Sequence, residues 1–217
     1  PDRRASSPRP AAEGKKAPEA EPRRAWLPAA LLVGLLVVHT AANLWWLYAD
    51  NHLIRVDEAH HLKCAADYYV HLTSDAGLIE RMTALMNVKS AYPPLSYLVG
   101  GLFAAAFGYG PDVITFSCTV MFLLIIVGVY CIGRTYLEPW PALFAAFVTS
   151  FLPLVFGLSR SFSQDYFSAA IVVWAIYALI KSDRYRDTLW VLAFAVLNGL
   201  GFLARPTTFV FLLVPSV

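Results

Sequence analysis

The sequence has few charged residues. Asp, Glu, Lys and Arg make up 15% of its 217 residues, whereas a soluble domain carries about 25%. The net charge is only +2 and the basic residues do not form one patch, so the sequence indicates no nucleic-acid partner. Cysteine is scarce as well, and three cysteines cannot build a disulfide framework. These scarcities exclude a disulfide-stapled scaffold and do not fit an ordinary soluble domain.

Apolar residues are abundant instead. They make up 58% of the chain, against about 45–50% in soluble proteins, and they are grouped into long uncharged stretches. We therefore predict an integral membrane protein whose fold class is all-α, a polytopic transmembrane helical bundle with interfacial helices in the first outer loop. The predicted spans are residues 27–48, 113–133, 139–158, 166–180 and 188–204.

The two ends of the sequence are interpreted separately. Residues 1–25 hold five prolines and seven Lys/Arg but no aromatic residue, which predicts a disordered tail. Its basic residues place it in the cytoplasm, and residues 26–217 then form the transmembrane module with an outer loop at 49–111. The last apolar stretch, residues 206–217, is shorter than the roughly 20 residues of a span. We therefore expect the module to be truncated at its C-terminus.

One short apolar segment decides the topology. Residues 95–107 would rise only about 20 Å as a helix, against about 30 Å of hydrocarbon. If the segment crossed the membrane, the basic loop with Lys181, Arg184 and Arg186 would lie outside, against the positive-inside bias. We therefore predict an interfacial or re-entrant helix. This choice puts Asp57 and Asp165 on the same, extracytoplasmic side, whereas a crossing segment would separate them.

The first outer loop contains the densest group of reactive side chains. Asp57 and Glu58 open a predicted surface helix whose apolar stripe is Leu62, Ala66, Tyr69 and Val70, with Cys64 on the polar face. Asp57 is interpreted either as a helix N-cap or as a general base above the membrane.

The same helix offers metal ligands. His60 or His61 could bind a divalent metal with Asp57 and Cys64, although this spacing matches no strong zinc signature. The histidines are also interpreted as ordinary surface residues. The cofactor requirement is left open, with a divalent metal as the one candidate.

Later polar residues lie at the ends of predicted spans. Asp165 follows Arg160 in a polar turn between two apolar segments, and Arg205 ends the segment 188–204. Each is interpreted either as a solvated or headgroup-facing charge or as part of a site, where an arginine could bind a phosphate through its planar fork.

These motifs together resemble the C-type glycosyltransferases of membranes, and in particular the protein O-mannosyltransferases and the bacterial lipid A aminoarabinose transferases. The resemblance covers residues 27–217. It is carried by four short motifs: Asp57-Glu58, Tyr92-Pro93-Pro94-Leu95, the stretch from Arg160 to Phe167, and Ala204-Arg205-Pro206-Thr207.

The resemblance implies an enzyme that transfers a sugar from a polyprenyl-phosphate donor to a glycan, lipid or protein acceptor at the outer side of the bilayer. It implies that Asp57 is the catalytic base, that Glu58 is its acidic neighbour, and that Asp165 organises the donor or a cation. Arg205 would bind the carrier phosphate, with Arg160 as a second basic residue.

One motif departs from the family pattern. The aminoarabinose transferases have a lysine before the proline of the second motif, where this chain has Tyr92. The nearest lysine is Lys89, so these two residues are the substrate-binding candidates of that loop.

Two other functions compete with this interpretation. A transporter or channel subunit would place charges near the middle of the membrane, and a non-catalytic scaffold would use the outer loop to bind a partner. The predicted spans are nearly free of charge and the polar groups gather at one interface, which favours an enzyme.

Overall fold

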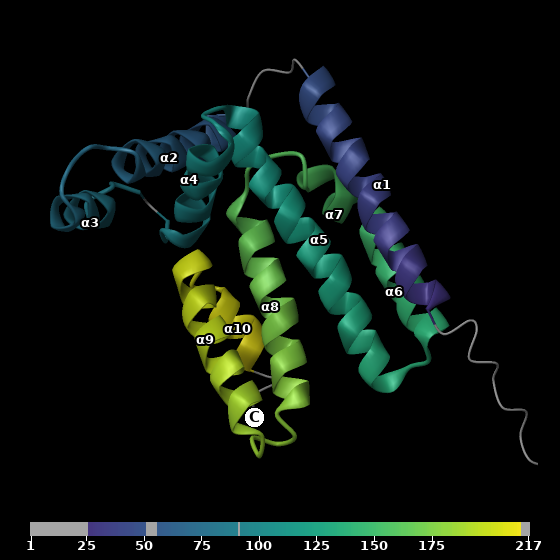
Figure 1. Ribbon diagram of the computed structural model, residues 1–217. Helices are drawn as coiled ribbons and strands as arrows, with labels where there is room; N and C mark the ends of the chain where they lie inside the picture. Colours follow the sequence, from purple (N-terminus) through teal and green to yellow (C-terminus); the bar gives the residue numbers. More distant parts are fainter. Residues whose placement is uncertain (1–25, 51–55, 91, 214–217) are drawn as a thin grey trace, which may run out of the picture.

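The computed structural model describes residues 26–50, 56–90 and 92–213. The predicted disordered tail at 1–25 and the last four residues, where a truncated end was predicted, lie outside these ranges. Figure 1 shows an all-helical chain, and no strand occurs in the described ranges, which confirms the all-α prediction. The helices are α1 (Leu27–Ala49), α2 (Val56–Leu72), α3 (Leu78–Met86), α4 (Leu95–Phe107), α5 (Pro111–Tyr136), α6 (Pro139–Phe151), α7 (Pro153–Leu158), α8 (Gln164–Lys181), α9 (Thr188–Ala204) and α10 (Thr208–Leu213).

The long helices form a bundle around α5 and α8. Helix α5 packs against α1, α6 and α8, and α8 also packs against α9. Among the described residues, α1 and α5 are the two helices that are long and apolar enough to cross a membrane. The predicted spans at 113–133, 166–180 and 188–204 lie within α5, α8 and α9.

The predicted span at 139–158 is wrong as a single helix. It is divided into α6 and α7 at Leu152, whose backbone is extended at φ −59° and ψ 125°. The following residue is Pro153, which has no N–H to continue the ladder and disfavours helical geometry at the residue before it. The break turns the chain at the end of the bundle that contains α2.

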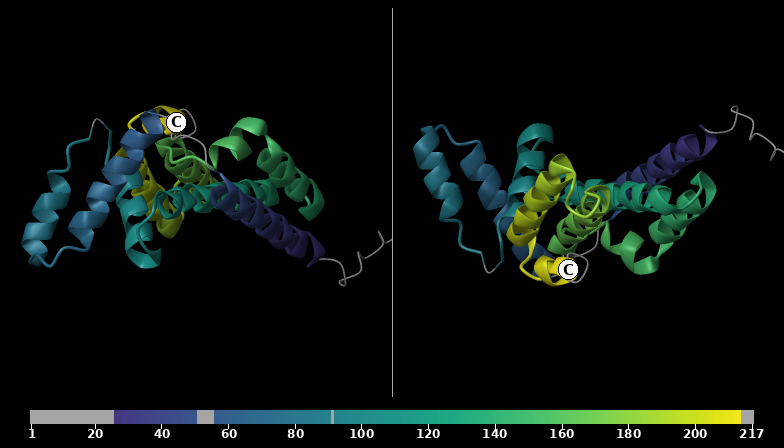
Figure 2. Two further views of the ribbon diagram at one scale, coloured as in Figure 1. Left: turned by 90° about the horizontal axis from the view of Figure 1, so that it is seen from above. Right: turned by 90° about the horizontal axis from the view of Figure 1, so that it is seen from below.

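The bundle has two chemically different ends. In Figure 1, α2, α7, the start of α8 and the end of α9 gather at one end, and the α5–α6 and α8–α9 connections lie at the other. The second end contains Arg134, Lys181, Arg184 and Arg186. Helix α4 lies beside α2 and does not run the length of the bundle. Figure 2 shows α3 extending sideways from the bundle, beyond α2.

Helix α4 packs very closely against α2. A Cβ atom added at Gly101 would lie 2.9 Å from the Tyr68 Cβ and 3.0 Å from the Tyr69 backbone nitrogen. Only a glycine allows the two backbones to approach this far. The contact brings Tyr97 of α4, which is fully buried, against the first turns of α2.

The predicted faces of α2 are wrong in part: Leu62 of the predicted apolar stripe is buried, but other residues are misassigned. Its buried side chains are His61, Leu62, Cys64, Ala65 and Tyr68, so Cys64 belongs to the packed face. Val70, assigned to the apolar stripe, is 57% exposed. The buried residues still follow helical spacing, but the face is selected by where α4 docks.

Candidate functional site

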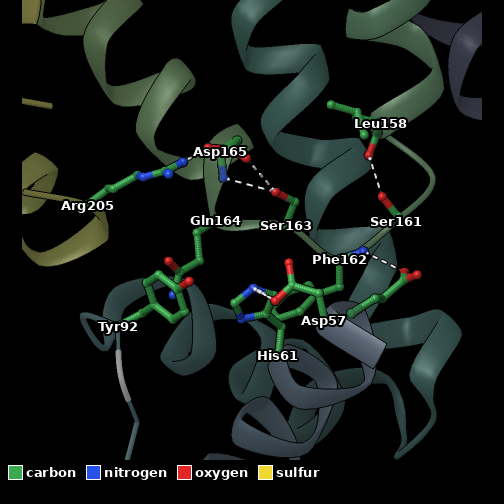
Figure 3. A pocket seen from close by; sticks show the side chains of 11 residues that line it. Asp57, His61, Tyr92, Leu158, Ser161, Phe162, Ser163, Gln164, Asp165 and Arg205 are labelled. Carbon is green, nitrogen blue, oxygen red and sulfur yellow. Dashed lines mark hydrogen bonds and ion pairs between the residues drawn. The ribbon is translucent and has the colours of Figure 1, made fainter. Parts of the chain in front are cut away.

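A cavity of about 230 Å³ lies at the α2 end of the bundle. Its walls come from α2, from the segment before α4, from the turn between α7 and α8, and from the end of α9 (Figure 3). The lining residues are Asp57, Glu58, His61, Tyr92, Leu158, Ser161, Phe162, Ser163, Gln164, Asp165 and Arg205. The structure thus brings Asp57 and Asp165 into one cavity. Their common membrane side, and the interfacial position of residues 95–107, stay predictions.

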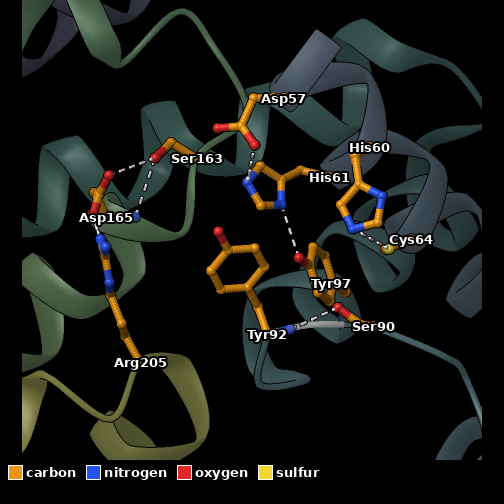
Figure 4. A network of polar contacts seen from close by, with 10 residues as sticks. All are labelled: Asp57, His60, His61, Cys64, Ser90, Tyr92, Tyr97, Ser163, Asp165 and Arg205. Carbon is orange, nitrogen blue, oxygen red and sulfur yellow. Dashed lines mark hydrogen bonds and ion pairs between the residues drawn. The ribbon is translucent and has the colours of Figure 1, made fainter.

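On the α2 side, Asp57 begins a chain of polar contacts that leads into the core. Its carboxylate oxygen Oδ1 lies 3.7 Å from Nε2 of His61, one turn later, and the Asp57 side chain is 85% exposed. The other ring nitrogen of His61, Nδ1, lies 2.8 Å from the Tyr97 hydroxyl (Figure 4). When the Tyr97 hydroxyl donates to Nδ1, the Nε2–H of His61 faces Asp57.

Burial lowers the pKa of His61 below its ordinary value; the Asp57 carboxylate opposes this effect and His60 adds to it. The imidazole is therefore neutral at pH 7. A neutral His61 contacts the Asp57 carboxylate without placing a positive charge beside it.

Glu58 has a different role from Asp57. Its Oε1 accepts a hydrogen bond of 2.9 Å from the backbone N–H of Phe162, whose side chain is 1% exposed. This contact joins α2 to the turn that precedes Asp165. Glu58 thus ties the two acidic walls of the cavity together, while its predicted role as the acidic neighbour of the base stays a prediction.

On the opposite side, Asp165 forms an ion pair with Arg205. Ser163 caps α8, because its hydroxyl accepts from the Asp165 backbone N–H at 3.2 Å and donates to the Asp165 carboxylate at 3.1 Å. The side chains of Arg205 and Asp165 remain 39% and 58% exposed. At the capped start of α8, the Asp165 carboxylate therefore orients the Arg205 guanidinium at the mouth of the cavity.

Arg160 is not part of this cavity. Its Nε donates to the buried Asn43 side chain of α1 at 3.0 Å, and its guanidinium lies 4.6 Å from the ring centre of Trp46 and 4.1 Å from that of Phe156. It lines a second cavity of about 780 Å³ between α1, α2, α5 and α7. The structure therefore separates the two arginines that the sequence analysis grouped together, although Glu58 contributes to both cavities.

Of the other predicted site residues, some line the first cavity and others lie outside it. Tyr92 lines the first cavity with its ring centre 5.3 Å from that of His61, whereas Lys89 is exposed and lines neither cavity. His60 Nε2 lies 3.8 Å from the Cys64 sulfur. Within the described ranges no three His, Cys, Asp or Glu side chains are grouped closely enough to hold a metal, and the metal site stays a prediction.

Comparison with known families identifies the chain. A family model described as dolichyl-phosphate-mannose-protein mannosyltransferase matches residues 91–215, which is more than half of the sequence. The chain belongs to this family. No curated protein and no solved structure matches it.

Membership in the mannosyltransferase family confirms the resemblance to C-type glycosyltransferases. The chain is thus a membrane glycosyltransferase that uses a lipid-linked sugar donor. The matched range contains Tyr92, Asp165 and Arg205, while Asp57 and Glu58 precede it. The link between these two parts of the site is structural: they meet in one cavity.

In this mannosyltransferase-family chain, the structure also places at or beside the cavity two residues that sequence reasoning missed. Gln164 is 5% exposed and lines the cavity, yet in the sequence it is one polar residue in a polar turn. Tyr97 lies in the segment predicted as an interfacial helix and was given no role, although its hydroxyl contacts His61. Gln164 lies within the motif from Arg160 to Phe167, but that motif gave it no role, and Tyr97 has no signal in the sequence. Both gain their position from the packing of helices distant in the chain.

Proposed function

We propose that the chain transfers a sugar from a polyprenyl phosphate to an acceptor hydroxyl on the extracytoplasmic side of the membrane, with Asp57 as the general base. The observation that supports this most directly is the shared cavity, with Asp57 on α2 facing the Asp165–Arg205 pair at the ends of α8 and α9 (Figure 3). A base and a fixed cation on different walls are what this transfer needs.

The chemistry assigns one role to each wall. The acceptor oxygen attacks the anomeric carbon of the donor while the bond from that carbon to the phosphate oxygen breaks. The hydroxyl proton passes to the Asp57 carboxylate, and the electron pair leaves on the lipid phosphate. Arg205 stabilises that anion, since a guanidinium matches phosphate geometry in a bidentate manner. Asp165 keeps the Arg205 guanidinium at the cavity.

The membrane side follows from charge. Arg134 and the basic α8–α9 connection lie at the end of the bundle away from the cavity. Because short basic loops stay in the cytoplasm, the cavity opens on the other side. The family description makes mannose the first sugar to test, and lipid, glycan and protein acceptors are all compatible with a cavity at the interface.

A transfer assay with Asp57→Asn tests this function. Membranes containing the chain receive radiolabelled polyprenyl-phosphate mannose, and label is measured in the lipid, glycan and protein fractions. We expect Asp57→Asn to lower transfer by about 10²–10⁴-fold, while Asp67→Asn, on the same helix but outside the cavity, retains it. Full transfer by Asp57→Asn would exclude the base. If the wild type moved the donor across the membrane without transferring its sugar, the transporter alternative would hold.

A further inference from the structure

The side chain of Gln164 is a buried polar group that faces the cavity. It is 5% exposed, and its amide nitrogen Nε2 has no hydrogen-bond partner within the described part of the chain. Buried amides are nearly always paired in native proteins, because an unpaired one loses its hydration without replacement. The side chain lines the cavity with Asp57 and Tyr92, so its missing partner is expected there.

The start of α8 fixes where this amide points. Gln164 is the first residue of α8 and stands between Ser163, which caps the helix, and Asp165, which contacts that cap. Figure 3 shows its side chain extending from the helix start into the pocket on the side of Tyr92, while Asp165 reaches toward Arg205. The amide and the ion pair are thus held at a fixed spacing by one turn of helix.

The walls around Gln164 suit one sugar residue. The cavity of about 230 Å³ is smaller than the roughly 300–1,000 Å³ of pockets for drug-sized ligands. It combines the Asp57 carboxylate, the Gln164 amide and the Tyr92 ring, which can bind hydroxyl groups and the apolar face of a sugar. In the proposed function Arg205 binds the donor phosphate. The neutral Gln164 amide is then available to bind the uncharged sugar.

We propose that Gln164 is a specificity-determining residue whose Nε2 donates a hydrogen bond to a hydroxyl of the transferred sugar. This inference rests on the proposed function, in which the same cavity holds the donor. It predicts that the amide distinguishes a sugar-bearing lipid phosphate from the bare carrier, whereas Arg205 binds both.

Equilibrium binding of two radiolabelled lipids tests the assignment. The chain in lipid nanodiscs is titrated with polyprenyl-phosphate mannose and with polyprenyl phosphate, for the wild type, Gln164→Leu and Arg205→Met. Leucine keeps the bulk of the side chain but removes its amide. We expect Gln164→Leu to weaken binding of the mannosyl lipid about three- to tenfold, as for one lost hydrogen bond, and to change binding of the bare lipid less than twofold. Arg205→Met should weaken both.

The outcomes distinguish a failure of the sugar contact from a failure of the proposed function. Equal weakening of both lipids by Gln164→Leu, or no weakening of either, overturns the sugar contact while leaving the proposed function in place. If Arg205→Met binds both lipids with wild-type affinity, the phosphate assignment within the proposed function fails instead. Melting of each variant is recorded alongside, and Gln164→Met replaces the leucine variant if the latter does not fold.

Discussion

Asp165 in the first turn of α8 forms an ion pair with Arg205 at the end of α9. The sequence presents them as two independent charges at the ends of apolar segments, but the structure makes them one unit. Since both side chains are partly exposed, the pair contributes little to folding, about 0–1 kcal/mol for surface pairs in general. Its importance lies in the direction it gives the guanidinium.

Asp165→Asn is therefore expected to change donor use more than stability. The free energy of unfolding should fall by less than about 1 kcal/mol, whereas the KM for the polyprenyl-phosphate donor should rise about tenfold as Arg205 loses its orientation, equivalent to about 1.4 kcal/mol. Asp183→Asn, in the α8–α9 connection, is the matched control. Thermal melting and transfer kinetics measure the two effects, and a large loss of stability with unchanged KM would contradict the positioning role.

Substitutions at Glu58 separate charge from geometry. Glu58→Gln keeps an oxygen that can accept from the Phe162 N–H, so most transfer activity should remain. Glu58→Ala leaves that N–H without its partner and should cost about 1–3 kcal/mol of stability, seen as a lower melting temperature. If Glu58→Gln were as inactive as Asp57→Asn, Glu58 would act through its charge, and its assignment as a positioning residue would be wrong.

Gly101→Ala tests the close contact between α2 and α4. The added methyl group would lie against the α2 backbone, so we expect a destabilisation of about 1–3 kcal/mol, as for other overpacked sites. Gly34→Ala in α1 is the control, because nothing lies within 4 Å of its Cβ position and alanine favours the helix by up to about 1 kcal/mol. Opposite shifts in melting temperature would support the contact, and parallel shifts would argue against it.

The stability of the protein should fall in mild acid because of His61. Its pKa is lowered by burial, so the unfolded chain binds a proton at a higher pH than the folded chain does. The stabilisation from neutral His61 is complete above its ordinary pKa of 6.5. It is lost as the pH falls from there toward the lower pKa of the folded state. Melting temperatures measured from pH 5 to 8 should show this slope in the wild type and in His71→Gln. A slope that persists unchanged in His61→Gln would rule out His61 as its source.

Cysteine labelling can establish the membrane side of the cavity. Single cysteines replace Asp57, Asp165 or Asp183 in a background without Cys64, Cys118 and Cys131, and sealed vesicles are treated with a thiol reagent that does not cross the membrane. The first two positions should react from outside and the third only after permeabilisation. Labelling of Asp57 and Asp165 positions from opposite sides would be incompatible with a single site.

The sequence predicted the course of the helices well, because their limits depend on local signals. Long uncharged stretches place α4, α5 and α9 within a few residues of their observed bounds. The division at Pro153 also has a local cause, but its effect was not recognised inside an otherwise continuous apolar segment.

What the sequence could not provide depends on partners far along the chain. The packed face of α2 is set by the glycine contact with α4, and Arg160 differs from Arg205 because Asn43, 117 residues earlier, binds it. The candidate site was predicted as a set of acids and bases. Asp57, Asp165 and Arg205 line one cavity, and their roles stay predictions. The roles of Gln164 and Tyr97 required the three-dimensional arrangement.

The cavity draws its lining from residues 57 to 205, which has a consequence for how the protein is made. A chain emerges from the ribosome N-terminus first, at about 5–20 residues per second. The contacts among Asp57, His61 and Tyr97 can form while α9 is still being synthesised, but Asp165 has to wait for Arg205, forty positions later. The α2 wall with Asp57 can therefore fold before Arg205 is synthesised. Insertion of the α8–α9 hairpin then completes the lining of the cavity.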